Sequence, residues 1–389
     1  MILPQCLQDA PAALALPSSE ATWQEWVHYG LTWSRPRTAG EQACARPTTS
    51  RAARPAGQHE LTFHSYREAT PGPRWQVLFD TTWPAYRSWY TAHDLEVRPS
   101  LAEARAALRE HMPELLPHWE RLVELAGGDP LAARMLTMWR MPAIGAGCSQ
   151  AVVPGHAPLL VRNYDYDPQL FEGVVASTNY SGQRRVIGTS DLLWGLVDGM
   201  NEDGLAVSLT LGGRPGSGHG FGIPIVIRYL LETCPDVESA IAALRRIPVA
   251  QAYNISLVDT AGHHATVYVA PGEPADVSDL RAATNHRLTV VEHPHISDPL
   301  RSRQRQRKLF AVLSDLESGG AVHELVDAFT RQPLRADAYD LGFGTLYTAA
   351  YRPAEGTVTY QWPGRSWTRH FDDDEAHIDV RLSSEVEDD

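Results

Sequence analysis

The sequence contains few cysteines, and their positions do not suggest pairing. Only four of the 389 residues are cysteine, Cys6, Cys44, Cys148 and Cys234, and long stretches of chain separate them. This spacing excludes the paired cysteines of a zinc site and the cysteine density of a disulfide scaffold. A cysteine with a special role in this chain is therefore predicted to have it through its reactivity.

Long apolar runs are also missing. No window approaches the roughly eighteen consecutive apolar residues of a membrane-spanning helix, although 43% of the residues are hydrophobic. The first residues, MILPQCLQDAPAALALPSSEA, lack the basic segment that opens a secretory signal. We therefore expect a globular protein that has no membrane partner and is located in the cytoplasm.

Positive charge is in deficit, with a formal net charge of -13. Proteins that bind nucleic acids meet the phosphates with clustered Lys and Arg, so a nucleic-acid partner is excluded. One basic run, RSRQRQRK at residues 301–308, departs from this balance. Because the apolar residues LFAVL follow it, we interpret the run as the solvated face of a helix.

Composition divides the chain into four segments. Residues 1–58 mix Ala, Pro, Arg and Ser with little periodicity, which predicts an irregular or disordered arm. Residues 59–147 and residues 148–372 carry helix and strand patterns and are expected to form two parts of one domain. The acidic residues 373–389 are predicted to be a solvated, partly disordered tail.

Helical patterns dominate the part before Cys148. After a strand pattern in ELTFHSY, residues 100–128 have helical spacing, with Ser100 as N-cap and Gly127 as the stop. The stretch DPLAARMLTMWRM, residues 129–141, is predicted to be another helix that leads to Cys148.

Short strand patterns broken by turns follow Cys148. VPGHAP and MNEDG are typical of hairpin connections. Residues 222–234 and 236–247 are expected to be consecutive helices, the second capped by Asp236, and strand patterns return at residues 253–270 and 345–362. Hairpins on both sides of a helical block indicate antiparallel sheets with helices packed on them, an α+β layered domain rather than a doubly wound parallel one.

The stretch MPAIGAGCSQAVV places Cys148 between a Gly-Ala-Gly run and a strand. A buried, unreactive cysteine is the plain alternative for such a residue. However, Gly145 and Gly147 remove Cβ bulk, which would let the chain bend and expose the Gly147 carbonyl group to the thiol.

The motif RNYDYD ends the next strand. If the hairpin turns near Gly155, Arg162, Asn163 and Asp165 fall back beside Cys148. An arginine there would favour the thiolate, and an aspartate would orient a nearby cation. The alternative is an ordinary surface ion pair between Arg162 and Asp165.

An ordered set of motifs over roughly residues 60–370 resembles a known family. The motifs GCS, LLVRNYDYD, GLVDGMNEDGLAVSLT, GFGIPIVIRYLLE, YNISLVDTAG, ATNH and TLYTAAYRP are similar to those of autoproteolytic acyltransferases typified by fungal acyl-CoA:isopenicillin N acyltransferase. That family is related to the choloylglycine hydrolases and acid ceramidases, all N-terminal nucleophile hydrolases. The resemblance implies a four-layer αββα sandwich with antiparallel sheets.

The resemblance also implies that the chain cuts itself between Gly147 and Cys148. Residues 59–147 would then belong to an alpha chain and residues 148–372 to a beta chain of one catalytic domain. The new α-amino group of Cys148, with a reference pKa of about 7.7 to 8.0, would serve as general base. The thiol would attack an amide or thioester carbonyl carbon and form an acyl-enzyme.

Further roles come from matching positions in the resembled family. Arg162 would lie near the thiol, Asp165 would hold the α-amino group, and the side-chain amide of Asn254 would help form the oxyanion hole. The alternative for Asn254 is a cap at a strand edge. A second set is expected near the substrate pocket, although plain core or structural roles fit it as well: Trp194, Tyr253, Asn285 and His286.

The implied substrate is a small-molecule amide with a linear C–N bond or an acyl thioester. Acyl-CoA is a co-substrate that no feature of the sequence establishes, and neither a metal nor an organic cofactor is expected. The alpha and beta chains would form a pair, with further assembly into a homo-oligomer left open. Two alternatives remain: a catalytically degenerate member that acts as a binding or scaffold protein, and an unprocessed hydrolase with an internal cysteine.

Overall fold

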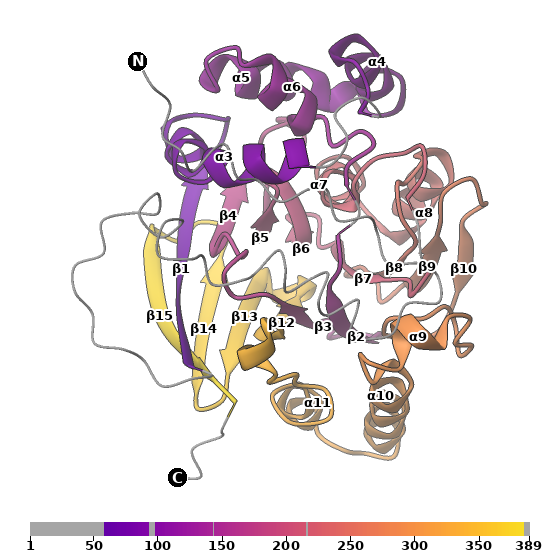
Figure 1. Cartoon of the computed structure of the whole chain (residues 1–389). Helices are drawn as coiled ribbons and strands as arrows, with labels where there is room; N and C mark the ends of the chain where they lie inside the picture. Colours follow the sequence, from indigo (N-terminus) through magenta and orange to yellow (C-terminus); the bar gives the residue numbers. More distant parts are fainter. Residues whose placement is uncertain (1–57, 93–97, 143, 215–216, 385–389) are drawn as a thin grey trace.

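Two β-sheets packed face to face form the centre of the computed structural model, which describes residues 58–92, 98–142, 144–214 and 217–384 (Figure 1). Strands β2 and β3 of one sheet contact β7 and β8 of the other. Helices cover the outer side of each sheet. The expected four-layer αββα sandwich is confirmed.

The larger sheet has nine strands in the spatial order β10-β9-β8-β7-β6-β5-β4-β1-β15. All neighbours run antiparallel except β1 and β4, which are parallel. The strands are β1 (Gln58–Glu68), β4 (Val174–Thr178), β5 (Val186–Asp191), β6 (Gly195–Asn201), β7 (Ala206–Leu211), β8 (Tyr253–Val258), β9 (His264–Val269), β10 (Asp276–Ser278) and β15 (Ala376–Ser383).

The smaller sheet has six antiparallel strands in the order β11-β2-β3-β12-β13-β14. They are β11 (Ala282–Ala283), β2 (Gly147–Val153), β3 (Leu159–Tyr166), β12 (Gly344–Arg352), β13 (Thr357–Trp362) and β14 (Arg365–His370). The predicted hairpin between β2 and β3 turns at Gly155, whose φ of 106° suits glycine.

The helices form the two outer layers. α7 and α8 pack on the larger sheet, and α10 and α11 pack on the smaller one. The helices are α3 (Pro73–Ala92), α4 (Leu101–His111), α5 (Leu116–Leu125), α6 (Pro130–Leu136), α7 (Ile223–Thr233), α8 (Val237–Arg246), α9 (Pro294–Ser297), α10 (Ser302–Glu317) and α11 (Val322–Phe329), with short 3-10 turns η3 (Pro113–Leu115), η4 (Tyr339–Leu341) and η5 (Pro353–Glu355). Within the described residues, none of these helices has the length and apolar character needed to cross a membrane.

Local signals explain most helix boundaries. Ser100 caps α4 by accepting a hydrogen bond from the Glu103 amide, and Asp236 caps α8, both as predicted. The helical stretch expected over residues 100–128 is, however, divided into α4, η3 and α5. Pro113 lies at the break, and because proline lacks an amide proton it cannot continue the hydrogen bonds of α4.

The acidic tail predicted for residues 373–389 is partly a strand, which corrects that expectation. β15 pairs antiparallel with β1, and its side chains alternate so that Ile378, Val380 and Leu382 are buried. This alternation offsets the local acidity by burying one apolar face. The predicted arm, apart from Gln58, and residues 385–389 lie outside the described residues.

Candidate active site

Cys148 is the second residue of β2 and belongs to the core between the two sheets. Its partner across the hairpin is Tyr164, and Gly147 pairs with Asp165. The chain just before the thiol packs on the same core, where Ile144 is half-buried. With 0% of its surface exposed, Cys148 is inaccessible to any substrate while the chain is intact.

Arg162 reaches the thiol from β3. Its Nη2 donates to the Cys148 Sγ at 3.5 Å, and both side chains are buried. Arg162 pairs with Gln150, two residues beyond Cys148, so alternation along the strands places Arg162 and Cys148 on the same face. The hairpin thus produces the predicted proximity of arginine and thiol.

A buried carboxylate holds the Arg162 guanidinium in place. Asp198 of β6 accepts hydrogen bonds from Arg162 Nη1 at 2.5 Å, from the Tyr347 hydroxyl at 2.7 Å and from the Tyr351 hydroxyl at 2.5 Å. Burial opposes a charge on Arg162, but the thiol, Tyr347 and Asp198 together raise its pKa well above the ordinary value. Arg162 therefore stays a cation beside Cys148.

Replacing Asp198 by asparagine is expected to slow chemistry at Cys148 by about 10- to 100-fold, because a hydrogen bond to a charged group contributes roughly 1.5–3 kcal/mol. The guanidinium would lose its counter-charge and its fixed direction. The measurement is the rate of acyl-group release at the thiol. Asp203→Asn, at an exposed aspartate in the next turn, is the matched control. An Asp198→Asn protein as fast as this control would show that the ion pair does not position Arg162.

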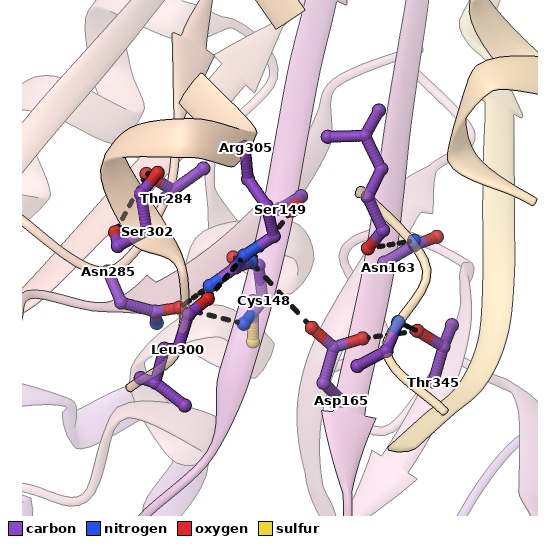
Figure 2. A network of polar contacts seen from close by, with 12 residues as sticks. Cys148, Ser149, Asn163, Asp165, Thr284, Asn285, Leu300, Ser302, Arg305 and Thr345 are labelled. Atoms are coloured by element: carbon purple, nitrogen blue, oxygen red, sulfur yellow. Dashed lines mark hydrogen bonds and ion pairs between the residues drawn. The ribbon is translucent and has the colours of Figure 1, made fainter. Parts of the chain in front are cut away.

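Arg305 of α10 reaches the backbone of Cys148 from the opposite face of the smaller sheet (Figure 2). Its Nη1 donates to the Cys148 carbonyl oxygen and to Ser149 Oγ, the latter at 2.8 Å. The same Nη1 lies 3.7 Å from Asp165 Oδ2. Arg305 lies within the run that we interpreted as a solvated helix face, and this interpretation was wrong for Arg305, which is 2% exposed.

Asn285 completes the contacts to the Cys148 backbone. Its Oδ1 accepts from the Cys148 amide at 3.1 Å and from Arg305 Nη2 at 2.6 Å, and its Nδ2 donates to the Leu211 carbonyl at 3.2 Å. The nitrogen of Cys148 and its carbonyl oxygen are thus each held by a side chain, Asn285 on one and Arg305 on the other (Figure 2).

Close packing explains the glycine before the thiol. A Cβ on Gly147 would lie 2.6 Å from the Phe343 Cζ and 3.3 Å from Asp165 Oδ2, so a larger residue there would have to displace the Phe343 ring and press on Asp165. Gly145 has open space around it, and the expected need for a small residue therefore holds for Gly147 alone. Asp165 is fixed by Thr345, whose Oγ1 donates to Oδ1 at 2.6 Å.

Burial governs the protonation of the site. It raises the pKa of the Cys148 thiol, an effect that Arg162 partly opposes. Burial also raises the pKa of Asp165, against the nearby charge of Arg305, and it lowers the pKa of Arg305. In the intact chain the thiol is therefore held mainly in its neutral form near pH 7.

The amide of Asn254 is directed away from the role predicted for it. Its Nδ2 donates to the carbonyl oxygens of Thr284 at 2.7 Å and His286 at 3.0 Å and to the Thr210 hydroxyl at 3.1 Å. Asn254 thereby fixes the two residues that flank Asn285. Its place in the oxyanion hole stays a prediction.

The other expected pocket residues have separate surroundings. The His286 ring is bonded to Ser302 at 2.7 Å and to Gln306 at 2.9 Å, and burial lowers its pKa. Trp194 is buried and donates to the Leu136 carbonyl. Tyr253 donates its hydroxyl to the side chain of Gln251 at 3.0 Å. In the described part of the chain, no three His, Cys, Asp or Glu side chains gather where they could hold a metal ion.

The sandwich and its buried cysteine at the start of a central strand define the N-terminal nucleophile hydrolase class of fold. The family model of acyl-coenzyme A:6-aminopenicillanic acid acyl-transferase matches residues 153–367, more than half of the chain. The protein belongs to this family. The match begins just after Cys148, so the assignment does not depend on the thiol.

Solved hydrolases of low sequence identity have a similar fold. A mutant of conjugated bile acid hydrolase from Clostridium perfringens is 12% identical, with 61% of this chain and 97% of that chain covered and a TM-score of 0.42. Penicillin V acylase from Agrobacterium tumefaciens is 15% identical over 57% and 84%, with a TM-score of 0.39. The Caenorhabditis elegans ortholog of N-acylethanolamine-hydrolyzing acid amidase is 14% identical over 53% and 93%, with a TM-score of 0.39. No curated protein matches the chain.

Proposed function

We propose that the protein is a self-processing cysteine hydrolase or acyltransferase that acts on a linear amide C–N bond or an acyl thioester. One observation carries the proposal. The Cys148 thiol lies against the Arg162 guanidinium, while Asn285 and Arg305 hold the backbone on its two sides. A thiol that attacks the adjoining peptide bond needs a nearby cation and a fixed backbone, and this site provides both.

Self-processing proceeds at the Gly147–Cys148 bond. The thiol attacks the Gly147 carbonyl carbon, the C–N bond breaks as the thioester forms, and the thiol proton passes to the released amine. Water then hydrolyses the thioester to a Gly147 carboxylic acid and the free Cys148 thiol. The products are residues 1–147 and residues 148–389.

The released α-amino group serves as base in the mature enzyme. In the intact chain this nitrogen donates a hydrogen bond to Asn285 Oδ1, and Asp165 pairs with Gly147 across the hairpin. With a reference pKa near 7.7 to 8.0, the amine takes the thiol proton at neutral pH. The thiol then attacks the substrate carbonyl, and water or an acceptor amine resolves the acyl-enzyme.

The oxyanion donor stays a prediction for Asn254, whose Nδ2 donates to the Thr284 carbonyl oxygen in the intact chain. Asn285 presents its Oδ1 to the Cys148 amide, while its Nδ2 donates to the Leu211 carbonyl oxygen. We therefore assign Asn285 to holding the Cys148 nitrogen and keep Asn254 as the proposed oxyanion donor. Loss of one such donor lowers the rate by about 100- to 1000-fold in enzymes of this kind.

The burial of the thiol separates the main proposal from an unprocessed internal-cysteine hydrolase. Cys148 has no exposed surface in the intact chain, so a substrate cannot reach it without a rearrangement. Three polar side chains directed at one cysteine, those of Arg162, Asn285 and Arg305, also argue against a binding protein without catalysis, since a purely structural cysteine needs none of them.

Intact mass and N-terminal sequencing of the purified wild-type protein test the proposal. Two polypeptides are expected, one of them starting at Cys148. The processed protein should then hydrolyse simple N-acyl amides or acyl thioesters. A single intact chain that hydrolyses neither would overturn the proposal.

A further inference from the structure

Gln251 makes a two-way contact with the chain just before the thiol. The Ile144 amide donates to Gln251 Oε1 at 3.1 Å, and Gln251 Nε2 donates to the Ile144 carbonyl oxygen at 3.4 Å. A side-chain amide here pairs with both polar groups of one backbone residue, as a neighbouring strand would. Gln251 therefore recognises the N–H and the C=O of one backbone residue, whatever side chain that residue carries.

Tyr253 adds a second donor to this contact. Its buried hydroxyl donates to Gln251 Oε1 at 3.0 Å, so two donors, the Ile144 amide and the Tyr253 hydroxyl, meet at the same oxygen. A flipped side-chain amide would set its NH₂ group against the Ile144 amide and its oxygen against the Ile144 carbonyl oxygen. Gln251 thus presents its oxygen and its nitrogen to Ile144 in one order, and Tyr253 supports that order.

Ile144 stands three residues before the bond to be cut, roughly 10 Å from it along an extended chain. Ile144 and Ala146 pack half-buried on the core that contains Cys148. The segment therefore occupies the acyl side of the thiol, with apolar groups near the thiol and an amide at the far end.

We propose that Gln251, positioned by Tyr253, is a specificity-determining residue for the acyl part of the substrate. It binds the N–H and the C=O of one residue about three residues' length from the scissile carbonyl, first in the chain itself and then in substrates with a peptide-like acyl chain. The inference rests on the proposed function. Once cleavage lets the residues just before Cys148 move aside, Gln251 loses its two hydrogen bonds to Ile144 and keeps the one from Tyr253, and the N–H and C=O of a substrate residue replace those of Ile144.

Self-cleavage gives the first test. Gln251→Met keeps the side-chain size and removes both hydrogen bonds, so we expect cleavage to slow by about ten-fold. Tyr253→Phe removes only the hydrogen bond from Tyr253 to Gln251 Oε1, so it should slow cleavage less than Gln251→Met does. Gln304→Met, at an exposed glutamine of α10, is the matched control. Cleavage of Gln251→Met at the wild-type rate would overturn the role in the precursor.

Two probe substrates test the mature enzyme: acetyl-Ile-Gly-Ala-Gly p-nitroanilide and its analogue with an ester oxygen in place of the isoleucine N–H. Release of p-nitroaniline gives kcat/KM for each. We expect wild type to favour the amide probe by about ten-fold and the fully cleaved Gln251→Met protein to lose this preference. A misfolded variant would lose activity on both probes and leave the ratio of the two kcat/KM values unchanged.

The outcomes separate this inference from the proposed function. If the wild-type chain neither cleaves itself nor hydrolyses acyl substrates, the proposed function fails. If wild type cleaves itself but does not favour the amide probe, or if Gln251→Met keeps the wild-type preference, only the role of Gln251 is overturned.

Discussion

Replacing Cys148 by alanine is expected to leave the protein as one uncleaved chain and to abolish its acyl-transfer and hydrolytic activity. The thiol is the only group proposed to attack a carbonyl carbon, and loss of an enzyme nucleophile lowers rates on the order of a million-fold. Arg162, Asn285 and Arg305 would remain in place but would have no nucleophile to serve. Intact mass and an acyl-release assay measure both effects.

Cys234→Ala is the matched control for this change. Cys234 is also a buried free cysteine, but it follows α7, where its sulfur lies 3.7 Å from the Thr233 hydroxyl. The control protein should be processed and active like wild type. If Cys148→Ala still yields a chain starting at residue 148, another group makes the cut and the proposed nucleophile is wrong.

Replacing Arg305 by methionine is expected to lower both self-cleavage and acyl transfer by at least about 100-fold. The change removes the hydrogen bonds to the Cys148 carbonyl and to Asn285, and it leaves the Asp165 carboxylate buried without its nearby cation. Breaking such a buried pair costs roughly 3–5 kcal/mol. The measurement is the cleavage half-time together with kcat/KM of the processed protein.

The rate deficit of Arg305→Met is also expected to depend on pH. Arg305 opposes the rise in the pKa of Asp165, so its removal raises that pKa further. The carboxylate fraction then falls sooner than in wild type as the pH is lowered, so the deficit relative to wild type should grow towards lower pH. Arg303→Met and Arg307→Met, at exposed positions of α10, are controls with unchanged rates. An equal rate deficit in all three variants would contradict a specific role of Arg305 and would point to the total positive charge of α10 instead.

The part of the site that could be predicted from sequence is the part built by one hairpin. Cys148, Arg162 and Asp165 lie on two strands joined at Gly155, so local spacing was enough to bring them together. Strand alternation then decides which side chains share a face. Because a turn of this kind is visible in the sequence, the expectation needed no tertiary information.

Arg305 and Asn285 were harder because α10 and the residues before it reach Cys148 only through the packed layers. They are separated from Cys148 by 157 and 137 positions. A signal for Arg305 was nevertheless present. Ser302, Arg305 and Leu309 repeat at helical spacing and form the buried face of α10, so periodicity outweighed the charge of the run.

Asp198 had no such signal. It appears as one polar residue between hairpin turns, and only the stacking of the two sheets brings it to Arg162, Tyr347 and Tyr351. The strand at residues 376–383 was missed for a related reason. Its acidic composition suggested solvation, but β1, more than 300 residues earlier, provides its partner.

The position of β1 bears on how a cut protein is assembled. β1 lies between β4 and β15, and both neighbours come from the far side of Cys148 (Figure 1). A separately made first polypeptide would have to insert a strand between two others in a bimolecular step whose rate depends on concentration. In a continuous chain the insertion is intramolecular, so the proposed cut would have to follow folding. If the chain is cut at Gly147–Cys148 as we propose, the first polypeptide is expected to stay as a permanent subunit rather than to be released.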